Sequence, residues 1–401
     1  MTTSLAGFSL AGVSAVAYCG ALALAMQGTR PPSRSVRRTA TGLLLAVAIV
    51  TPLFCARQAS AAGDLQEVYS ELELDETPLF SVDSALGAVA YTPGRGLRVG
   101  ETGLTLGGYS NVNLVRDEGG PARLSLDDLS FFIIWDPTPR LHFFSEQEFE
   151  DLLEVDDHGH GGTNGNTYSL ERLYGDFAAT DALNVRVGQF LTPVGRWNVI
   201  HAQPLVWTTS RPLVTLLPFA QQTTGAMFFG SLFPAMGSLT YTLYGQFVNS
   251  LDAEPHAPQA ADRSAGARLE YWSDTGGSVG ASYFGFTDQG QWQHLGGLDT
   301  FWRRGPMELM GEFAYVGAPQ PLGNQWGLYL QSALEVWPRT YLVGRYEHFD
   351  QRAPQPEVNL FITGLAFKPV PYVVLKAEYL FADHPAEESP PGFKSSFAIL
   401  F

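Results

Sequence analysis

The amino-acid sequence from about residue 100 to its end alternates between apolar and polar residues at every second position. In residues 104–114, the even positions include Leu104, Leu106, Val112 and Leu114, whereas the odd positions are mostly polar. This is the period of a β-strand and not of a helix. Because successive strand side chains point to opposite faces, the pattern predicts strands with one apolar and one polar face.

The number of these segments and the connections between them narrow the choice of fold. The connections alternate between brief turns and generally longer polar loops. An even number of antiparallel strands with this asymmetry is typical of a closed membrane barrel. The sequence therefore predicts an all-β fold, a transmembrane antiparallel β-barrel of about 16 strands within residues 100–401. The strands are expected at residues 101–115, 122–136, 140–154, 166–178, 183–190, 224–232, 238–249, 264–273, 277–287, 291–303, 307–317, 325–337, 340–349, 358–368, 372–382 and 392–401.

Four tryptophans favour the barrel over a soluble β-sandwich, whose strands would also alternate. Trp135, Trp272, Trp302 and Trp337 each lie where a predicted strand enters a short turn. Tryptophan rings collect where membrane hydrocarbon meets the headgroups, so these positions match one rim of a membrane barrel. A barrel of this size is too wide for side chains to fill, and its lumen should conduct solutes unless a loop narrows it.

The first 61 residues differ in charge from the rest, with five arginines and no acidic residue. An uncharged run over 39–54 follows Arg34, Arg37 and Arg38, and small residues end at Ala61. We therefore expect a signal peptide over 1–61, cleaved after Ala61. A second uncharged stretch, residues 5–26, precedes this segment. We interpret residues 1–25 as an over-extended start, which lies before the true start of translation. The alternative is that this stretch is a retained inner-membrane helix. Residues 62–99 would form an acidic periplasmic segment, either a flexible extension, a short helix or a plug.

Composition excludes several classes of function. A formal net charge of −16 argues against a nucleic-acid partner. The two cysteines, Cys19 and Cys55, both lie in the leader, so the mature chain can form no disulfide, thiolate metal site or haem attachment. A phosphate-binding P-loop is also absent from the sequence. We therefore expect no cofactor, no metal and no catalytic residue.

The longest connection between predicted strands, residues 191–223, is the candidate for narrowing the lumen, as the third long loop. Residues 182–251 contain no Asp or Glu in a chain that is otherwise acidic. The local potential should be positive, which favours anionic or neutral solutes. Aromatic rings here would stack on solutes or, alternatively, pack the loop against the wall. The candidate constriction residues are Arg186, Arg196, Arg211, Trp197 and Trp207.

Charged residues on the polar faces of other predicted strands carry both signs. Such a mixture predicts weak overall ion selectivity. We expect the following side chains to face the lumen: Arg268, Glu308, Glu312, Arg345, Glu347, Lys376 and Glu378.

Residues 183–195, LNVRVGQFLTPVG, resemble the element that precedes the third loop in outer-membrane porins of the porin O and P type. Val194 stands where that family usually has an aromatic residue. The matching residues are Arg186, Gly188, Phe190, Pro193 and Gly195. The resemblance extends loosely over residues 100–401. It implies a trimer of sixteen-stranded barrels with loop three folded inward, and makes the terminal Phe401 a signal for the barrel-assembly machinery.

Phosphate selectivity in that family is attributed to a ladder of lysines along the pore. This chain has only three lysines, Lys368, Lys376 and Lys394. The resemblance therefore implies the channel architecture and not the phosphate specificity, with Arg196 and Arg211 as a smaller basic substitute.

The expected function is that of an outer-membrane porin of a bacterial cell, a channel for ion transport and for passive diffusion of small hydrophilic solutes. We expect a weak preference for anionic or neutral solutes. The expected partners are outer-membrane lipid and lipopolysaccharide, the barrel-assembly machinery, the diffusing solutes and two further copies in a homotrimer.

Three other interpretations remain open at this point. In the first, the barrel is not a porin but the sheath of a porin–cytochrome electron conduit, or another outer-membrane interaction protein such as an adhesin. A GxSxG pattern over 276–280 would make Ser278 a nucleophile, although it lies between two predicted strands and not at a strand-to-helix elbow. An acidic, histidine-bearing outer loop over 150–160 would hold a divalent cation, or is simply solvated.

Overall fold

The structure, a computed structural model, describes residues 74, 76–163, 167–180, 182–249, 251, 261–288, 290–352, 354–386 and 388–401. The expectations for residues 1–61, a signal peptide with an over-extended start, lie outside this part of the chain. In the described residues, none of the helices is long and apolar enough to cross a bilayer.

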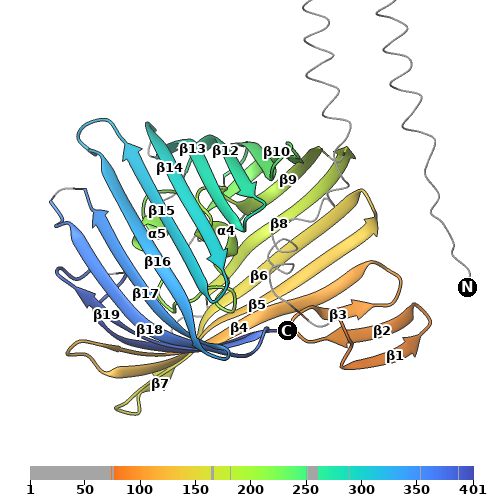
Figure 1. Ribbon diagram of the computed structural model, residues 1–401, viewed down its shortest axis with the longest axis horizontal. Coiled ribbons are helices and arrows are strands. Elements are labelled where there is room, and N and C mark those ends of the chain that lie inside the picture. The colour runs from red at the N-terminus through yellow and green to blue at the C-terminus, as the bar shows by residue number, and fades with distance from the viewer. Residues whose placement is uncertain are drawn as a thin grey trace, which may run out of the picture. The chain divides into compact units, whose positions relative to one another are not determined.

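A closed antiparallel barrel of sixteen strands dominates the described residues (Figure 1). Each strand pairs with its neighbours along the chain, and the last pairs with the first, with Gly392 opposite Asp117 and Leu400 opposite Tyr109. The predicted fold and strand number are therefore confirmed. The barrel strands are β4 (Leu104–Asp117), β5 (Ala122–Thr138), β6 (Leu141–Asp156), β8 (Thr167–Thr180), β9 (Leu183–Leu191), β10 (Gln222–Leu232), β11 (Ser238–Gln246), β12 (Arg263–Ser273), β13 (Gly277–Asp288), β14 (Gln291–Arg304), β15 (Met307–Gly317), β16 (Gln325–Trp337), β17 (Thr340–Asp350), β18 (Val358–Val370), β19 (Val373–Ala382) and β20 (Gly392–Leu400).

The alternation in the sequence sorts side chains between the outside and the inside of the barrel. On β16, Leu330 and Leu334 are exposed on the outer face, whereas Tyr329, Gln331 and Ala333 are buried on the inner face. Exposed apolar side chains recur in this way around the barrel. An apolar outer band is what a barrel presents to lipid, because strand backbones satisfy their hydrogen bonds within the closed sheet.

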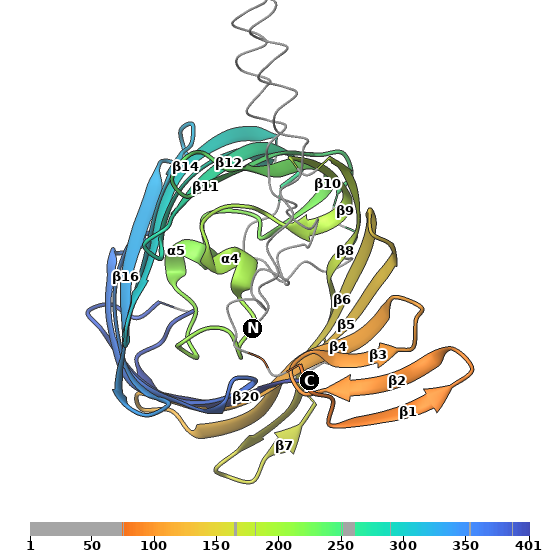
Figure 2. The ribbon, with the colours of Figure 1, turned by 45° about the vertical axis from the view of Figure 1, so that its right-hand side comes forward.

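Three short strands precede the barrel: β1 (Phe80–Ser84), β2 (Gly87–Thr92) and β3 (Gly96–Val99). They form an antiparallel extension whose last strand pairs with β4, and Figure 2 shows it projecting beside the barrel wall. The expectation of a flexible extension, helix or plug is therefore wrong for residues 80–99. Strands of four to six residues give too short an alternation to recognise. The turns between them depend on Gly87 and Gly96, whose φ angles are +98° and +92°.

The acidic stretch over 150–160 also differs from its expected form. Strand β6 continues to Asp156, so most of the acidic residues expected in an outer loop belong to the barrel wall. Beyond it, the two-residue strand β7 (Gly161–Gly162) pairs back onto β6. His158 and His160 lie in the connecting turn, where the His160 ring contacts the Asp156 carboxylate at 3.0 Å.

Candidate functional site

The connection between β9 and β10, residues 192–221, lies inside the ring of barrel strands, as Figure 2 shows through its two short helices. These are α4 (Trp197–Ile200) and α5 (Leu213–Leu216). We call residues 192–221 the inner loop. On the long-loop side of the barrel it is the third connection, in the order that the sequence predicts.

Two glycines of the family-like motif direct the chain into the barrel. Gly188 has a φ of +136° and Gly195 a φ of +67°, conformations that side chains with a Cβ rarely adopt. A Cβ at Gly188 would overlap the Leu173 carbonyl, and one at Gly195 would overlap the Glu312 carboxylate. The glycines therefore permit both the backbone turn and the close approach of the inner loop to the wall.

Carboxylates on the barrel wall hold the inner loop by its backbone. Glu312 on β15 accepts the N–H groups of Arg196 and Trp197 at 3.1 and 2.6 Å. Glu347 on β17 accepts the Leu213 N–H at 2.8 Å, at the start of α5. These N–H groups have no partner within their short helices, so the wall carboxylates satisfy donors that would otherwise be buried unpaired.

Two further wall carboxylates hold the middle of the inner loop. Glu308 on β15 accepts the Trp207 indole N–H at 2.5 Å. Glu378 on β19 accepts the backbone N–H groups of Thr209 and Ser210 at 3.0 and 2.8 Å. Hydrogen bonds to an ionised acceptor are stronger than neutral ones, which makes this arrangement a firm attachment.

Cations on the same wall bind the oxygen atoms of the inner loop. Arg345 on β17 donates to the Thr208 hydroxyl at 2.5 Å, and to the carbonyl and hydroxyl of Ser210 at 2.9 and 2.7 Å. Lys376 on β19 donates to the carbonyl and side-chain oxygens of Gln203 at 2.8 and 2.7 Å. The loop is thus fixed to β15, β17 and β19 by side chains of both signs.

All seven charges expected to face the lumen are buried inside the barrel. Six of them bind the inner loop, so they do not line an open path as separate charges. The seventh, Arg268, pairs with Asp299 at 2.5 Å on the neighbouring wall. The expectation of a charge-lined lumen therefore needs this correction: in the native barrel the mixed signs mainly position the loop.

The two aromatic residues that are candidates for the constriction pack against protein. Trp197 is 2% exposed and lies edge-on to Tyr329, with ring centroids 6.1 Å apart. Trp207 is 9% exposed and lies 4.5 Å from the Tyr341 ring. Both rings are thus covered by the barrel wall. They pack the loop against the wall, which is the alternative to stacking on solutes.

The three candidate arginines lie in different environments. Arg186 is on β9 in the wall, paired with Asp176 at 2.8 Å with both side chains almost fully buried. Its charge is compensated by an acid just outside the acid-free stretch, which the sequence interpretation did not consider. The Arg196 guanidinium lies over the Phe301 ring at 4.3 Å, a cation–π contact.

Arg211 is the candidate whose charge is bound to the inner loop itself. It donates to Asn198 Oδ1 at 2.7 Å and to the Thr215 carbonyl at 3.0 Å. Burial lowers the pKa of Arg211 to about 10, which still leaves the guanidinium charged at neutral pH. The side chain therefore contributes one fixed positive charge inside the barrel.

An acidic wall faces the inner loop from the other side, and the sequence interpretation missed it. It is formed by β5, β6 and β8 and includes Asp128, Glu146, Glu148, Glu150 and Glu171. Glu146, Glu148 and Glu150 occupy every second position of β6, which places them on the same face of the strand. This spacing is the signal in the sequence from which the acidic wall could have been predicted. That wall also contains Arg172, which donates to Glu146 at 2.5 Å.

The remaining candidate motifs take clear places in the fold. Ser278 lies in strand β13 after a turn from β12, so the described structure does not give it the strand-to-helix elbow of a GxSxG nucleophile. At the other end of the chain, Phe401 exchanges backbone hydrogen bonds of 2.8 and 2.9 Å with Gly108 on β4. The carboxyl end is thus fixed at the closing seam of the barrel.

Comparison with known proteins supports the architecture. No family model matches the chain. An uncharacterised protein of Aquifex aeolicus (strain VF5) is 23% identical over an alignment of 360 residues, and the match covers 75% of this chain and 80% of that protein.

Several solved structures resemble the barrel. An anion-selective porin from Comamonas acidovorans has a TM-score of 0.51 and 15% identity, over 74% of this chain and 98% of its own. OmpF of Salmonella typhi, in complex with daunomycin, has a TM-score of 0.54 and 10% identity, over 76% and 99%. OmpT of Vibrio cholerae, in a trimer form, has a TM-score of 0.51 and 10% identity, over 74% and 99%. At these identities the likeness shows the fold, a barrel of the kind found in outer-membrane porins.

Proposed function

We propose that the chain is a porin of a bacterial outer membrane, a channel through which ions and small hydrophilic solutes diffuse passively. The observation that carries this proposal is the inner loop, fixed by Glu312, Glu347 and Glu378 inside a closed sixteen-stranded barrel. An apolar outer face suits lipid, and a wide barrel narrowed by a fixed loop suits a size-limited diffusion path. The likeness to a solved barrel named as an anion-selective porin supports the same conclusion.

The proposed selectivity is a weak preference for anionic or neutral solutes. In its support, a cavity of about 50 Å³ between the inner loop and the wall is lined by Arg196, Arg303 and Lys368 and by one acid, Glu308, which pairs with Arg303 at 2.7 Å. Arg211 adds a further positive charge within the loop. The acidic wall on β5, β6 and β8 opposes these cations, which is why the preference is weak.

The proposed assembly is a homotrimer in outer-membrane lipid and lipopolysaccharide. The trimer form named for the Vibrio cholerae OmpT supports this proposal. We also propose that residues 1–61 are removed as a signal peptide, that residues 62–99 face the periplasm, and that Phe401 is read by the barrel-assembly machinery.

The test is a single-channel recording in a planar bilayer. The full-length chain would be expressed in a Gram-negative host, extracted from outer membranes and checked for a folded barrel by circular dichroism. Under a KCl gradient, we expect stable open currents and a reversal potential of the sign that anion preference produces. A folded barrel without current would contradict the porin proposal and favour the sheath or adhesin interpretation. A reversal potential of the opposite sign would contradict the selectivity alone.

A further inference from the structure

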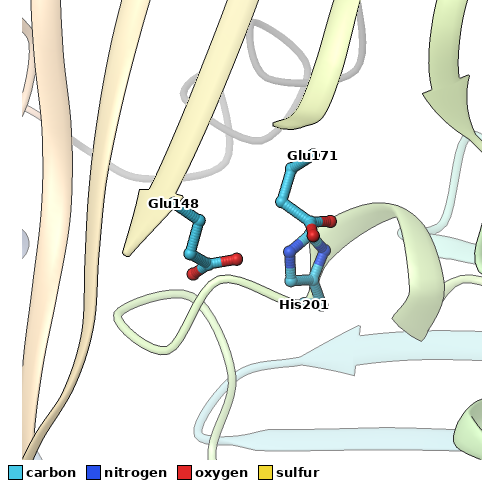
Figure 3. Close-up of side chains that lie close together, drawn as sticks. All are labelled: Glu148, Glu171 and His201. Atoms are coloured by element: carbon cyan, nitrogen blue, oxygen red, sulfur yellow. The ribbon is translucent and has the colours of Figure 1, made fainter. Parts of the chain in front are cut away.

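Three side chains from different parts of the chain meet on the acidic wall. They are Glu148 on β6, Glu171 on β8 and His201, which follows α4 in the inner loop. Each offers one ligand atom, and these atoms all lie within 4.8 Å of one another. Figure 3 shows the Glu171 carboxylate beside the His201 ring and the Glu148 carboxylate extended towards them. Asp128 and Glu150 form a second group of the same kind with Glu148.

The histidine is oriented by a hydrogen bond outside this cluster. His201 Nδ1 lies 3.3 Å from the Asn198 carbonyl oxygen, which can only accept, so Nδ1 carries the proton. The Nε2 lone pair is then available to a ligand, and a carbonyl partner of this kind is usual for histidines that bind metals. The Asn198 side chain is itself fixed by bonds to the Thr192 and Gln221 carbonyls at 2.9 and 3.0 Å.

The two carboxylates are also oriented by neighbours. Glu148 Oε1 accepts hydrogen bonds from the Tyr109 and Ser130 hydroxyls at 2.7 and 2.9 Å. Glu171 Oε1 accepts a hydrogen bond from the Ser169 hydroxyl at 2.7 Å. These bonds each use one oxygen of a carboxylate and leave the other to a further partner. Outer partners of this kind hold metal ligands in place.

The electrostatic balance of the cluster favours a bound cation. Carboxylates this close repel one another unless a cation or a proton offsets their charge. Arg211 is bonded to Asn198 and Thr215, and Arg172 to Glu146, so the nearby cations already bind other groups. A neutral imidazole is the form that binds metals, and the hydrogen bond from Nδ1 to the Asn198 carbonyl leaves Nε2 to the ion.

We propose that Glu148, Glu171 and His201 bind one divalent transition-metal ion of the Zn²⁺ class. Imidazole favours such ions over Ca²⁺ and Mg²⁺, and three protein ligands leave a coordination position to water. Ligand atoms of a tetrahedral zinc site lie about 3.3 Å apart. The observed upper limit of 4.8 Å thus requires only small side-chain rotations.

The position of the site gives the ion a mechanical role. Hydrogen bonds attach the inner loop to β15, β17 and β19, and also to Ser282 on β13 and Ser396 on β20. Glu148 and Glu171 lie on other strands, β6 and β8. A metal ion held with His201 therefore links the loop to the acidic wall and neutralises part of that wall. Any effect of the ion on permeation rests on the proposed channel function, whereas metal binding itself does not.

The test measures Zn²⁺ binding to the full-length, untagged protein in metal-free detergent, by competition with a chromophoric chelator after EDTA treatment. We expect about one ion per barrel and a loss of affinity of at least about 10-fold in His201→Gln and in Glu171→Gln. His294→Gln is the matched control, because His294 is exposed on β14 and contacts Tyr283 at 2.8 Å. Circular dichroism confirms that each variant is folded.

Equal Zn²⁺ affinity in the wild type and both site variants would overturn the proposal, as would an equal loss in His294→Gln. Ca²⁺ binding that matches Zn²⁺ and depends on the same residues would overturn the transition-metal assignment. A separate bilayer recording compares conductance with Zn²⁺ and with EDTA, and we expect Zn²⁺ to lower it in the wild type and not in His201→Gln. Because binding is measured in detergent, a barrel that carries no current would contradict the channel function without affecting the metal result.

Discussion

The Glu312 carboxylate, on the barrel wall, accepts the backbone N–H of Trp197 at 2.6 Å although the two residues are 115 positions apart in the sequence. The same carboxylate accepts the Arg196 N–H and the Tyr329 hydroxyl at 3.1 and 3.0 Å. One buried side chain thus joins the inner loop, β15 and β16. The position of the loop depends on such wall residues more than on its own short helices.

Replacing Glu312 with Ala should loosen the inner loop. Two buried backbone donors lose their acceptor, and leaving a buried donor unsatisfied costs about 1–3 kcal/mol. We expect a larger and noisier single-channel conductance and faster proteolysis within residues 192–221. Glu335→Ala is the control, because Glu335 accepts a hydrogen bond from the Arg339 N–H in a turn and does not contact the loop. Unchanged conductance and proteolysis in Glu312→Ala would show that the other attachments suffice.

Replacing Gly195 with Ala should displace the inner loop from β15. The new Cβ would overlap the Glu312 carboxylate, in addition to the strain of a φ of +67°. Gly323→Ala separates the two effects, because Gly323 has a φ of +73° and no atom lies within 4 Å of the position that its Cβ would take. We expect a lower thermal midpoint and altered conductance in Gly195→Ala. Equal effects in the two variants would mean that backbone strain alone is responsible.

The buried ion pair of Arg186 and Asp176 should be costly to break from one side. Asp176→Asn removes the Asp176 charge from the buried pair, and breaking a buried ion pair from one side destabilises proteins by about 3–5 kcal/mol. Replacing Arg186 with Met at the same time removes the positive charge of the pair. In urea unfolding of the detergent-solubilised barrel, we expect the double variant to be more stable than Asp176→Asn. Additive losses in this double-mutant cycle would refute coupling between the two residues.

Neutralising Arg211 should shift the ion selectivity towards cations. Arg211→Gln removes the charge and keeps amide donors for Asn198 and the Thr215 carbonyl. Arg211→Lys keeps the charge and is the matched control. We expect the reversal potential under a KCl gradient to move towards the cation side in Arg211→Gln and to stay near the wild-type value in Arg211→Lys. The same shift in both variants would point to a moved loop and not to lost charge.

Acid should weaken the loop between β19 and β20 through Asp383. Its carboxylate accepts the Asn359 backbone and side-chain N–H groups at 2.8 and 2.6 Å, which lower the pKa of Asp383 to about 2. The folded pKa lies below the ordinary value of 3.8, so this stabilisation is present above about pH 4 and is lost as the pH falls towards 2.

Unfolding of Asp383→Asn should therefore depend less on pH between about 2 and 4 than unfolding of the wild type. Asp274→Asn is the control, because Asp274 accepts only the Gly237 N–H among the described residues, at 3.1 Å. A pH dependence in Asp383→Asn identical to that of the wild type would assign the effect to other carboxylates.

The sequence by itself determined the barrel. The number and order of the strands, their approximate positions and the two faces of β16 follow from an alternation that each segment carries locally, because the side-chain period of a strand is set by its own backbone. The inward path of the inner loop was also predictable in outline, from its length and from the motif that contains Gly188 and Gly195. The short strands over 80–99 were not predictable, because they are stabilised by pairing to β4 more than by their own pattern.

Only the tertiary structure decided which charges the inner loop neutralises and which groups meet inside the barrel. Glu312 and Trp197, Arg186 and Asp176, and the cluster of Glu148, Glu171 and His201 are brought together by closure of the sheet and by folding of the loop. The sequence carries the sign of each charge but does not specify its partner. Pairing between distant residues depends on register and curvature around the whole ring, and no local pattern encodes that distance.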